Sequence, residues 1–358
     1  MTLILSNADV EQVLSMQECI DVLETTYREL ASGVGLSRRR SDCLAPTSRD
    51  DAVYGLKSMD GVVPSLEISA VRVNSDIITW PRTGAHRRRV KIPAAPNNRY
   101  VGLILLFSTA NGEPLAILPD GVVQRMRVGA TNGLGAKYMA RKDARVVGLL
   151  GSGWQAGAQL MAVCCVRDIA RIQCFSPNRD NREAFSAAMS KQLGVAVIPV
   201  DTPDAALDGA DITMCATNAN SKIYGPEWVW PGLFMTCLKH VEIDAAAVSL
   251  ADRVAVHTHD PSPIHEVVDG IAALPTRYTR KGWAEIEQLD FTKLPQLTDL
   301  ITGRVKGRTS DGEITCFINN FGLGYQFAGV GAVVYRKARE AGLGRELPTE
   351  WFTQDVHP

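Results

Sequence analysis

The sequence predicts an α/β protein in which one domain is built on a doubly wound parallel sheet and a second domain is of the α+β kind. The chain has 358 residues, and two domains are expected because a single hydrophobic core stops growing at roughly 250 to 300 residues. From residue 146 onward, short apolar runs alternate with helical segments, which is typical of a parallel sheet covered by helices. Before that point, β-branched and apolar runs are separated by Gly, Pro and Asn, which indicates strands of another sheet.

The first domain opens with a helix. Ser15 and Glu18 form a capping-box pattern, and apolar residues then recur at helical spacing to about Leu30. Residues 53–73 and 100–118 are expected to be strands, and the basic, Pro-rich stretch 80–99 between them to be a loop or an extended hairpin tip. Residues 314–340 are expected to be helical and, because they contain four glycines, closely packed against another element.

The second domain follows a regular alternation of elements. Strands are expected over residues 146–150, 172–175, 195–200, 212–217, 233–238 and 254–256, with helices after Trp154 and from Arg182. We place the domain boundaries at residues 121–304 for this domain and at residues 1–120 together with 305–358 for the other.

Composition excludes several classes of protein. Hydrophobic residues make up 46% and charged residues 22% of the chain, as in ordinary folded proteins, and a net charge of -1 provides no basic field for nucleic acid or membrane. The apolar stretch at the N-terminus is too short for a signal peptide or a spanning helix, so a cytoplasmic protein is expected.

The eight cysteines are scattered without Cys-x-x-Cys spacing and are interpreted as buried free thiols. His257 and His259 lack a carboxylate pattern around them, and no metal site is predicted.

A glycine-rich turn indicates a dinucleotide site. The strand at 146–150 runs directly into Gly151-Ser152-Gly153-Trp154-Gln155-Ala156, which has the Gly-x-Gly-x-x-Ala spacing of a Rossmann domain. The first glycine allows a tight turn, the second lets backbone N–H groups approach a pyrophosphate, and the small sixth residue lets helix and strand pack closely. The alternative is a purely structural turn. The context of strand, turn and helix favours NAD(P) binding by residues 151–155.

The second strand of this domain suggests which dinucleotide is used. Enzymes that prefer NAD usually place a carboxylate there, about 20 residues after the glycines, to bond the ribose 2′-hydroxyl. Here the strand leads into Ser176, Asn178 and Arg179, with no carboxylate before Asp180. These side chains, with Arg182, are suited to a 2′-phosphate, so NADP(H) is weakly preferred; the simpler interpretation is that both arginines are solvated. Thr217 and Asn218, after a later strand, are also assigned to the cofactor.

Several segments together resemble one family. Residues 123–133, which contain Arg127, residues 54–57, residues 227–232, and residues 307–324 with their Gly-Arg and Glu-Ile-Thr motifs are similar to segments of the ornithine cyclodeaminase/mu-crystallin family. The resemblance extends from the first helix to about residue 338. It implies a Rossmann domain, a homodimer formed through the β-sheet of the other domain, and an active site between the two domains.

The resemblance also implies a carboxylate-binding site. Lys57 and Arg127 would bind the substrate carboxylate, assisted by one arginine of the run 38–40, which we take to be Arg40. The residue types suit this role, since arginine offers a planar fork and lysine a compact charge. For Arg40 the alternative is an exposed basic turn. Lys57 lies in an apolar strand, where a buried lysine has to be paired.

One departure from the family pattern affects the expected reaction. Cyclodeaminases of this family carry an aspartate base after the fifth Rossmann strand, where this chain has Lys239 and His240, and Glu242 matches a downstream acid instead. His240 or Lys239 is expected to donate a proton to an imine, although both are also compatible with an exposed loop.

We therefore expect an NAD(P)-dependent oxidoreductase that reduces an imino acid or dehydrogenates an amino acid. The alternatives are ornithine cyclodeamination to proline, disfavoured by the missing aspartate, and a mu-crystallin-like protein that binds cofactor and ligand without turnover. A small amino or imino acid would be its partner, with neither nucleic acid nor membrane. The basic residues Arg82, His86, Arg87, Arg88, Arg89 and Lys91 form either a solvated charge run or a segment that selects a substrate with a second acidic group.

Overall fold

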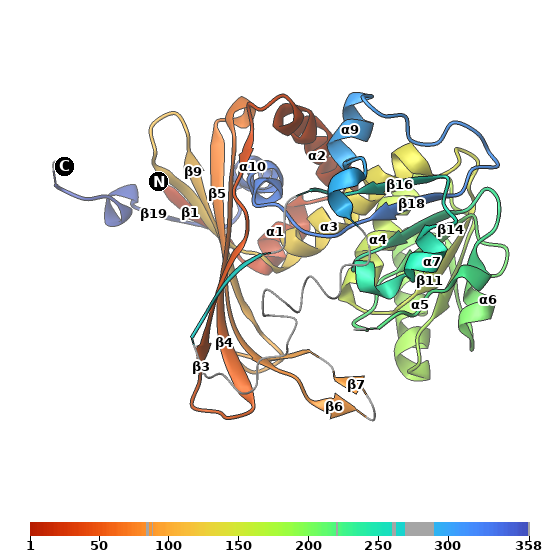
Figure 1. Cartoon of the computed structure of the whole chain (residues 1–358). Helices are drawn as coiled ribbons and strands as arrows, with labels where there is room; N and C mark the ends of the chain where they lie inside the picture. Colours follow the sequence, from red (N-terminus) through yellow and green to blue (C-terminus); the bar gives the residue numbers. More distant parts are fainter. Residues whose placement is uncertain (84–85, 88, 220, 260–262, 269–289, 357–358) are drawn as a thin grey trace. The chain divides into compact units, whose positions relative to one another are not determined.

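The computed structural model describes residues 1–83, 86–87, 89–219, 221–259, 263–268 and 290–356, with only the backbone described at 82–83 and 86–87. The chain divides into two compact units (Figure 1). The sheet unit comprises Met1–Arg127, Asp260–Glu285 and Gly322–Pro358, and the Rossmann unit comprises Val128–His259 and Ile286–Phe321. The division falls inside helix α3, Gly121–Met139.

The sheet unit is built around a large, mostly antiparallel sheet. Its strands are β1 (Thr2–Ile4), β2 (Leu36–Ser37), β3 (Ser41–Pro46), β4 (Ala52–Val63), β5 (Ile68–Thr79), β8 (Val90–Ile92), β9 (Val101–Ser108), β10 (Pro114–Pro119), β17 (Ile264–Val267) and β19 (Arg345–Leu347). The order is β17-β3-β4-β5-β9-β10-β1-β19, with β2 paired to β4 and β8 to β5. Two further short strands, β6 (Arg82–Thr83) and β7 (His86–Arg87), pair with each other.

Among the described residues, three helices lie wholly in this unit: α1 (Asn7–Val13), α2 (Met16–Ala31) and α10 (Tyr325–Glu340). The capping box at Ser15 and Glu18 is present, which confirms the predicted start of α2. Helix α10 packs on β4 and β5 with α2 beside it (Figure 1). Glycine permits this close approach, because a Cβ on Gly61 would lie 2.3 Å from the backbone nitrogen of Tyr325, and one on Gly331 would lie 2.7 Å from Leu106.

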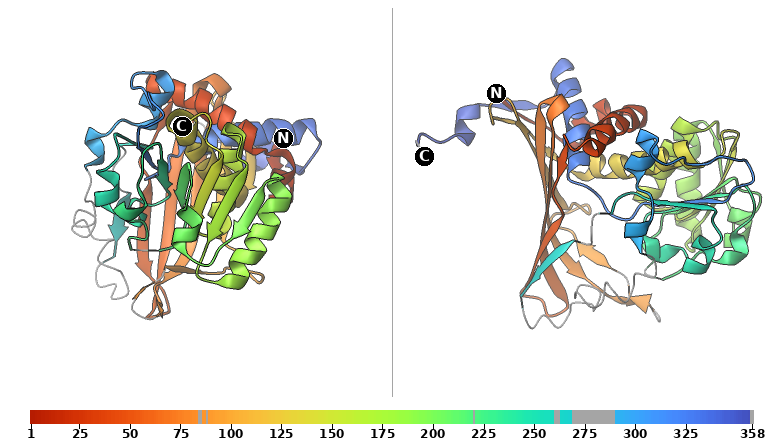
Figure 2. Two further views of the ribbon diagram at one scale, coloured as in Figure 1. Left: turned by 90° about the vertical axis from the view of Figure 1, so that its right-hand side faces the viewer. Right: turned by 45° about the horizontal axis from the view of Figure 1, so that its top comes forward.

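The two faces of the sheet differ in character. Alternate residues of β4 and β5 are buried, and these include Lys57 on β4 and Arg72, Asn74 and Asp76 on β5. Because successive side chains of a strand point to opposite faces, and Lys57 pairs with Asn74 in register, these polar side chains share one face. We call this side the Lys57 face. The side views show this sheet as a continuous curved layer with α10 against it (Figure 2).

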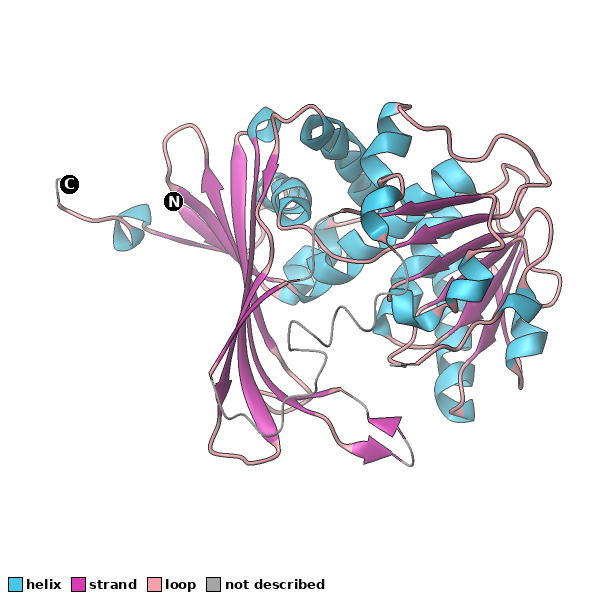
Figure 3. Ribbon diagram, viewed as in Figure 1, coloured by secondary structure: helices cyan, strands magenta, loops and turns pink. Residues whose placement is uncertain are grey.

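The Rossmann unit has seven parallel strands in the order β13-β12-β11-β14-β15-β18-β16. They are β11 (Val146–Leu150), β12 (Arg171–Phe175), β13 (Ala196–Pro199), β14 (Ile212–Cys215), β15 (Phe234–Cys237), β16 (Arg253–Val256) and β18 (Thr315–Ile318). The helices are α4 (Trp154–Val166), α5 (Arg179–Leu193), α6 (Pro203–Leu207), α7 (Ala245–Val248) and α9 (Leu297–Thr302), and helices flank the strands (Figure 3). The doubly wound parallel sheet is confirmed.

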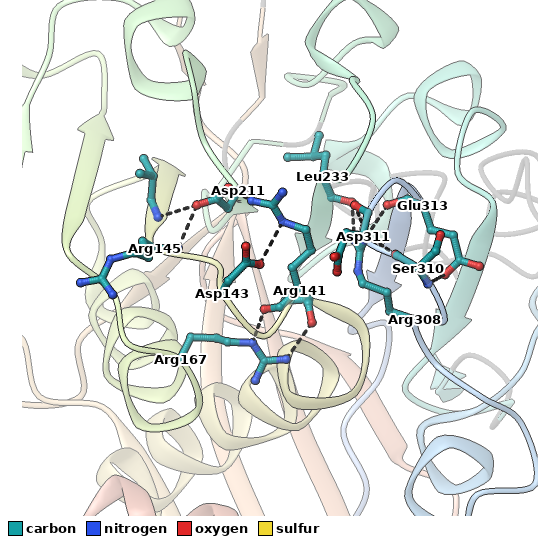
Figure 4. Close-up of polar contacts among 12 residues, drawn as sticks. Arg141, Asp143, Arg145, Arg167, Asp211, Leu233, Arg308, Ser310, Asp311 and Glu313 are labelled. Atoms are coloured by element: carbon teal, nitrogen blue, oxygen red, sulfur yellow. Dashed lines mark hydrogen bonds and ion pairs between the residues drawn. The ribbon is translucent and has the colours of Figure 1, made fainter.

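Half-buried arginines connect the elements of this unit (Figure 4). Arg308 donates to the backbone oxygens of Met139 and Leu233 at 2.8 and 2.9 Å. Arg167 donates to the carbonyls of Ala136 and Ala140 near the end of α3. Helix ends leave carbonyls without partners inside the helix, so these guanidinium groups stabilise the end of α3. The Gly-Arg motif at 307–308 therefore has a structural role here.

Three sequence predictions need correction. The helical prediction for 314–340 is wrong in its first part, because Thr315–Ile318 is β18, a fully buried strand between β15 and β16. A short apolar run cannot be distinguished from a buried helix by periodicity alone. Cys43 and Cys165 are exposed rather than buried, and Cys164 is half-buried. Helix α5 begins at Arg179 rather than at Arg182, because Asn178 caps it.

The division into units also differs from the expected boundaries. Residues 305–321 lie in the Rossmann unit because β18 completes its sheet, and β17 lies in the sheet unit because it pairs with β3. Within the described part of the chain, no helix is both long and apolar enough to cross a membrane.

Candidate active site

Lys57 is buried on the sheet unit and paired. Only 3% of the residue is exposed, and its Nζ lies 2.5 Å from Oδ2 of Asp76. Oδ1 of the same carboxylate lies 2.8 Å from Nζ of Lys91 on β8. One buried aspartate thus holds two ammonium groups, which satisfies the requirement that a buried lysine be paired.

The surroundings of Lys57 lower the pKa of its ammonium group. Burial, followed by repulsion from Arg89, lowers the pKa of Lys57 to about 7, against the opposing effect of Asp76. The ammonium is therefore present below neutral pH and is lost above it. A carboxylate ligand would favour the charged form, since opposite charges stabilise each other in a buried site.

Arg40 directly precedes β3, the strand that pairs with the strand of Lys57. Its Nε and Nη2 donate to the two oxygens of the fully buried Asp42 at 2.7 and 2.6 Å, which is a bidentate pair. Asp42 stands opposite Lys57 in the strand register. Nδ1 of His265 on β17 lies 3.7 Å from the same carboxylate. About one third of the Arg40 side chain is exposed, so it is a held side chain rather than a free basic turn.

The ion pair between Arg72 and Asp120 on this face was not predicted from the sequence. Arg72 on β5 donates to Asp120 at 2.8 Å, and Asn74 donates to the same carboxylate at 3.0 Å. All three residues are less than 10% exposed. The detectable signal was the alternation of Arg72, Asn74 and Asp76 along one strand, since polar residues at period two point to the same face.

Arg127 is buried near the start of α3 and held by neutral groups. Its Nη1 and Nη2 donate to the side-chain oxygens of Gln326 and Gln124, each at 2.8 Å. Its guanidinium also lies 5.1 Å from the ring centre of Phe327. Gln326 in turn donates to Tyr27 at 2.9 Å, so helices α2, α3 and α10 together orient this side chain.

These groups form a charged cluster on the sheet unit. We define the charged cluster as Arg40, Lys57, Arg72, Arg89, Lys91 and Arg127 with the carboxylates Asp42, Asp76 and Asp120. It has three more positive than negative groups when all are ionised. The structure thus brings together the three residues assigned to substrate binding, Arg40, Lys57 and Arg127, all of which belong to the sheet unit.

The glycine turn of the Rossmann unit has the expected strand, turn and helix context. Gly151 has φ +121°, and a Cβ there would lie 2.3 Å from the carbonyl oxygen of Ala216. Gly153 is the residue before α4, and a Cβ there would meet nothing within 4 Å. Gly151 is therefore required by the fold, whereas Gly153 faces open space where a ligand has room. Ser152 lies in the same turn, and Trp154, which is 57% exposed, and Gln155 are the first residues of α4.

The end of β12 carries the residues assigned to a 2′-phosphate. Asn178 caps α5 by accepting a hydrogen bond from the backbone of Asn181 at 2.8 Å. The Arg179 side chain is 75% exposed, and its Nε lies 2.7 Å from Glu183. Arg182 is mostly buried, donates to the backbone oxygen of Ser176 and pairs with Asp201, so it holds the loop together rather than extending into solvent.

The ends of β14 and β15 are joined by Glu242, which the sequence analysis did not assign. It is fully buried, and its Oε1 accepts hydrogen bonds from the backbone and hydroxyl of Thr217 at 2.8 and 2.6 Å. Its Oε2 accepts from the backbone N–H of Lys239 at 3.2 Å. Burial raises the pKa of Glu242. The neighbouring Asn218 is exposed.

Lys239 and His240 follow β15. Nζ of Lys239 donates to the carbonyl of Ala219 at 2.6 Å, so it bridges to the loop after β14. His240 packs edge-on against Phe291 with ring centres 5.3 Å apart, and burial lowers its pKa. His240 is thus a half-buried, mainly neutral imidazole at neutral pH rather than an exposed loop residue. His257 and His259 both bond backbone oxygens.

Three comparisons place the chain among known proteins. A profile of the ornithine cyclodeaminase/mu-crystallin family matches residues 1–342. The solved structure of Thermococcus litoralis Delta(1)-pyrroline-2-carboxylate reductase, in complex with NADH and L-proline, has a TM-score of 0.77 and 27% identity, with 97% of this chain and 100% of that chain covered.

Two related sequences have different activities. A Delta(1)-pyrroline-2-carboxylate reductase of Bacillus cereus is 27% identical, with 72% of this chain and 78% of that protein covered. The alanine dehydrogenase of Archaeoglobus fulgidus is 25% identical, with 97% and 98% covered. Both matches span more than two thirds of each protein.

Proposed function

The chain belongs to the ornithine cyclodeaminase/mu-crystallin family, and from that premise we propose that it is an NAD(P)-dependent oxidoreductase which reduces an imino acid or dehydrogenates an amino acid. The observation that carries this proposal is the charged cluster, which contains six cations and three carboxylates. A carboxylate ligand would offset that excess and gain charge-assisted hydrogen bonds. The relatives that act on pyrroline-2-carboxylate and alanine support an amino or imino acid.

Lys57 and Arg127 are proposed to bind the substrate carboxylate, with Arg40 assisting. Arg127 suits this role because the two amides that hold it are neutral and do not offset its charge. Lys57 shares Asp76 with Lys91, so this carboxylate does not neutralise both ammonium groups. Holding the carboxylate from two sides would fix the orientation of the Cα.

The cofactor is assigned to the Rossmann unit, where Gly151, Ser152, Gly153, Trp154 and Gln155 would hold the pyrophosphate and Thr217 and Asn218 would lie near it. A nicotinamide dinucleotide bound there would exchange a hydride with the Cα of the substrate. His240 or Lys239 would transfer the proton at the substrate nitrogen. Burial lowers the pKa of His240, so His240 would donate as imidazolium at acidic pH, while Lys239 is held by a carbonyl.

We also infer a preference for NADP(H). No carboxylate follows β12 before Asp180, and Arg179 is exposed at the start of α5 beside Ser176 and Asn178. Replacing Arg179 with alanine should weaken NADPH binding by about tenfold or more and leave NADH nearly unchanged, because only the 2′-phosphate loses a partner. Arg171→Ala, at the opposite end of β12, is the matched control. The affinities for both cofactors are measured by fluorescence titration. An equal loss of affinity for NADPH and NADH in Arg179→Ala would contradict the inference.

A homodimer is proposed through the sheet unit. Leu56 on β4 and Val101 and Leu103 on β9 are each about 40% exposed and lie opposite the Lys57 face. Leu56 and Val101 both flank Ser75 in the strand register, and Leu103 lies beside Val73. A contiguous apolar surface of this kind is typical of a protein interface.

Turnover tests the function directly. Absorbance at the reduced nicotinamide band is followed with NADH and NADPH against a panel of cyclic and acyclic imino acids, and in the reverse direction with amino acids. We expect oxidation of the reduced cofactor with at least one imino acid. Binding of cofactor and carboxylate without turnover across the panel would instead favour a ligand-binding protein. Release of ammonia from ornithine would favour cyclodeamination.

A further inference from the structure

The charged cluster holds more positive charge than one carboxylate ligand neutralises. Among the described residues it contains six cations and three carboxylates. When all groups are ionised, binding of one substrate carboxylate lowers the excess from three positive charges to two. Without a ligand, deprotonation of Lys57 likewise leaves an excess of two positive charges. Lys57, Arg72 and Arg127 are buried, and Arg40, Arg89 and Lys91 are partly buried. Because a charge removed from water is costly unless it is paired, this excess favours a ligand with more than one negative group.

Arg89 is a cluster cation with no carboxylate partner among the described residues. Its Nε is buried and has no hydrogen-bond partner among the described residues. The other cluster cations on the sheet strands have carboxylate partners: Lys57 and Lys91 share Asp76, and Arg72 binds Asp120. A buried guanidinium nitrogen without an acceptor is unfavourable unless a ligand supplies one.

The position of Arg89 separates it from the other arginines. It directly precedes β8, which pairs with the end of β5 at residues 77–79. Arg72 lies further back on β5, and Asn74, opposite Lys57, lies between. Burial first, and then repulsion from Arg89, lower the pKa of Lys57, so Arg89 and Lys57 belong to the same charged cluster.

We propose that Arg89 binds a second acidic group of the substrate, which is therefore an α-amino or α-imino dicarboxylic acid. This rests on the proposed function and adds a substrate class to it. The first carboxylate lies with Lys57 and Arg127, and the side chain extends along β5 toward Arg89. The side chains of Arg82, His86, Arg87 and Arg88, the other basic residues of this segment, lie outside the described residues.

The test compares each dicarboxylic amino acid with its amide. L-Glutamate and L-glutamine, and L-aspartate and L-asparagine, have nearly the same shape and differ in the side-chain charge. We expect kcat/KM of the acid to exceed that of the amide by about 10- to 100-fold in at least one pair, the range expected for one charge-assisted hydrogen bond. In Arg89→Gln the acid should lose that advantage, while kcat/KM for the amide changes by less than about threefold.

Arg99→Gln is the matched control, because Arg99 is exposed on the same connection between β5 and β9. It should retain the preference for the acid. Equal use of acid and amide by the parent, or an equal loss for both in Arg89→Gln, would overturn the proposal. If the enzyme acts only on monocarboxylic substrates in a Lys57-dependent manner, the proposed function stands and this inference fails.

A binding measurement covers the case in which none of these amino acids is turned over. Glutarate and succinate are compared with their monoamides, glutaramate and succinamate, as stabilisers against thermal unfolding, with and without NADPH. The dicarboxylates should raise the melting temperature of the parent more than the monoamides do, and Arg89→Gln should remove the difference. No difference in the parent would overturn the proposal independently of catalysis.

Discussion

At the scale of single residues, the site depends on how buried charges are paired. The family resemblance implies that Lys57 binds a substrate carboxylate, and its place in an apolar strand predicts that it is paired, but the identity of its partner was not predictable. Its partner Asp76 lies 19 residues away, and the carboxylate partner of Arg72, Asp120, lies 48 residues away. Such pairs arise from the strand register and from loop closure, which a pattern within one segment does not specify.

Replacing Lys57 or Arg127, the two residues proposed to bind the substrate carboxylate, should weaken substrate binding without affecting cofactor binding. In Lys57→Met and Arg127→Met, the KM of the best imino acid should rise by about one to two orders of magnitude, because each loses a charge-assisted hydrogen bond of roughly 1.5–3 kcal/mol. The Kd of NADPH should change by less than about twofold. Steady-state kinetics and cofactor titration measure both, and circular dichroism verifies folding. An unchanged KM in both variants would show that Lys57 and Arg127 do not bind the substrate carboxylate.

The lowered pKa of Lys57 predicts that carboxylate binding weakens as pH rises. With a pKa of about 7, Lys57 is charged below pH 7 and increasingly neutral above it, while a carboxylate such as cyclopentanecarboxylate stays ionised throughout. Its Kd should therefore increase about tenfold or more between pH 7 and pH 9. In Lys57→Arg this rise should disappear, because a guanidinium stays protonated over the range. The same rise in both proteins would assign the titration to another group.

At the scale of elements, the strands of the Rossmann unit were largely predictable because each apolar run is short and bounded by turn residues. The predicted strand at 146–150 coincides with β11, and the glycines after it form the expected turn. The helical prediction missed the strand at 315–318, although Asn319 and Asn320 end its apolar run before the glycine-rich helix α10. The assignment to β18 depends on two partner strands that lie far away in the sequence.

Substitutions at the two glycines of the turn should have different effects, one on cofactor binding and the other on the stability of the fold. Gly153→Val adds a side chain where no protein atom lies within 4 Å, so the melting temperature should change little while cofactor affinity falls by at least tenfold. Gly151→Ala should destabilise the protein instead, since its φ is +121° and its Cβ would meet Ala216. Differential scanning calorimetry and cofactor titration are read together. Parent-like cofactor binding by Gly153→Val would contradict the assigned pyrophosphate site.

At the scale of the whole molecule, the two units carry separate parts of the proposed reaction. The residues assigned to the substrate carboxylate all belong to the sheet unit, whereas those assigned to the dinucleotide and the proton belong to the Rossmann unit. The sheet unit consequently has two different faces: the Lys57 face bears the charged cluster, and the opposite face bears the exposed apolar residues. That second face has no proposed role in catalysis, which makes it the candidate for self-association.

The exposed apolar face predicts a homodimer that one charged residue disrupts. Leu103 lies in the middle of β9, and an arginine there would place an unpaired charge within an apolar interface, at a cost of several kcal/mol for each of the two symmetric sites. Size-exclusion chromatography with light scattering should give twice the monomer mass for the parent and the monomer mass for Leu103→Arg. Leu250→Arg is the matched control, because Leu250 is 49% exposed on the Rossmann unit and outside this face. A parent protein that is monomeric at micromolar concentration, or a Leu103→Arg variant that stays dimeric, would show that this face does not form the interface.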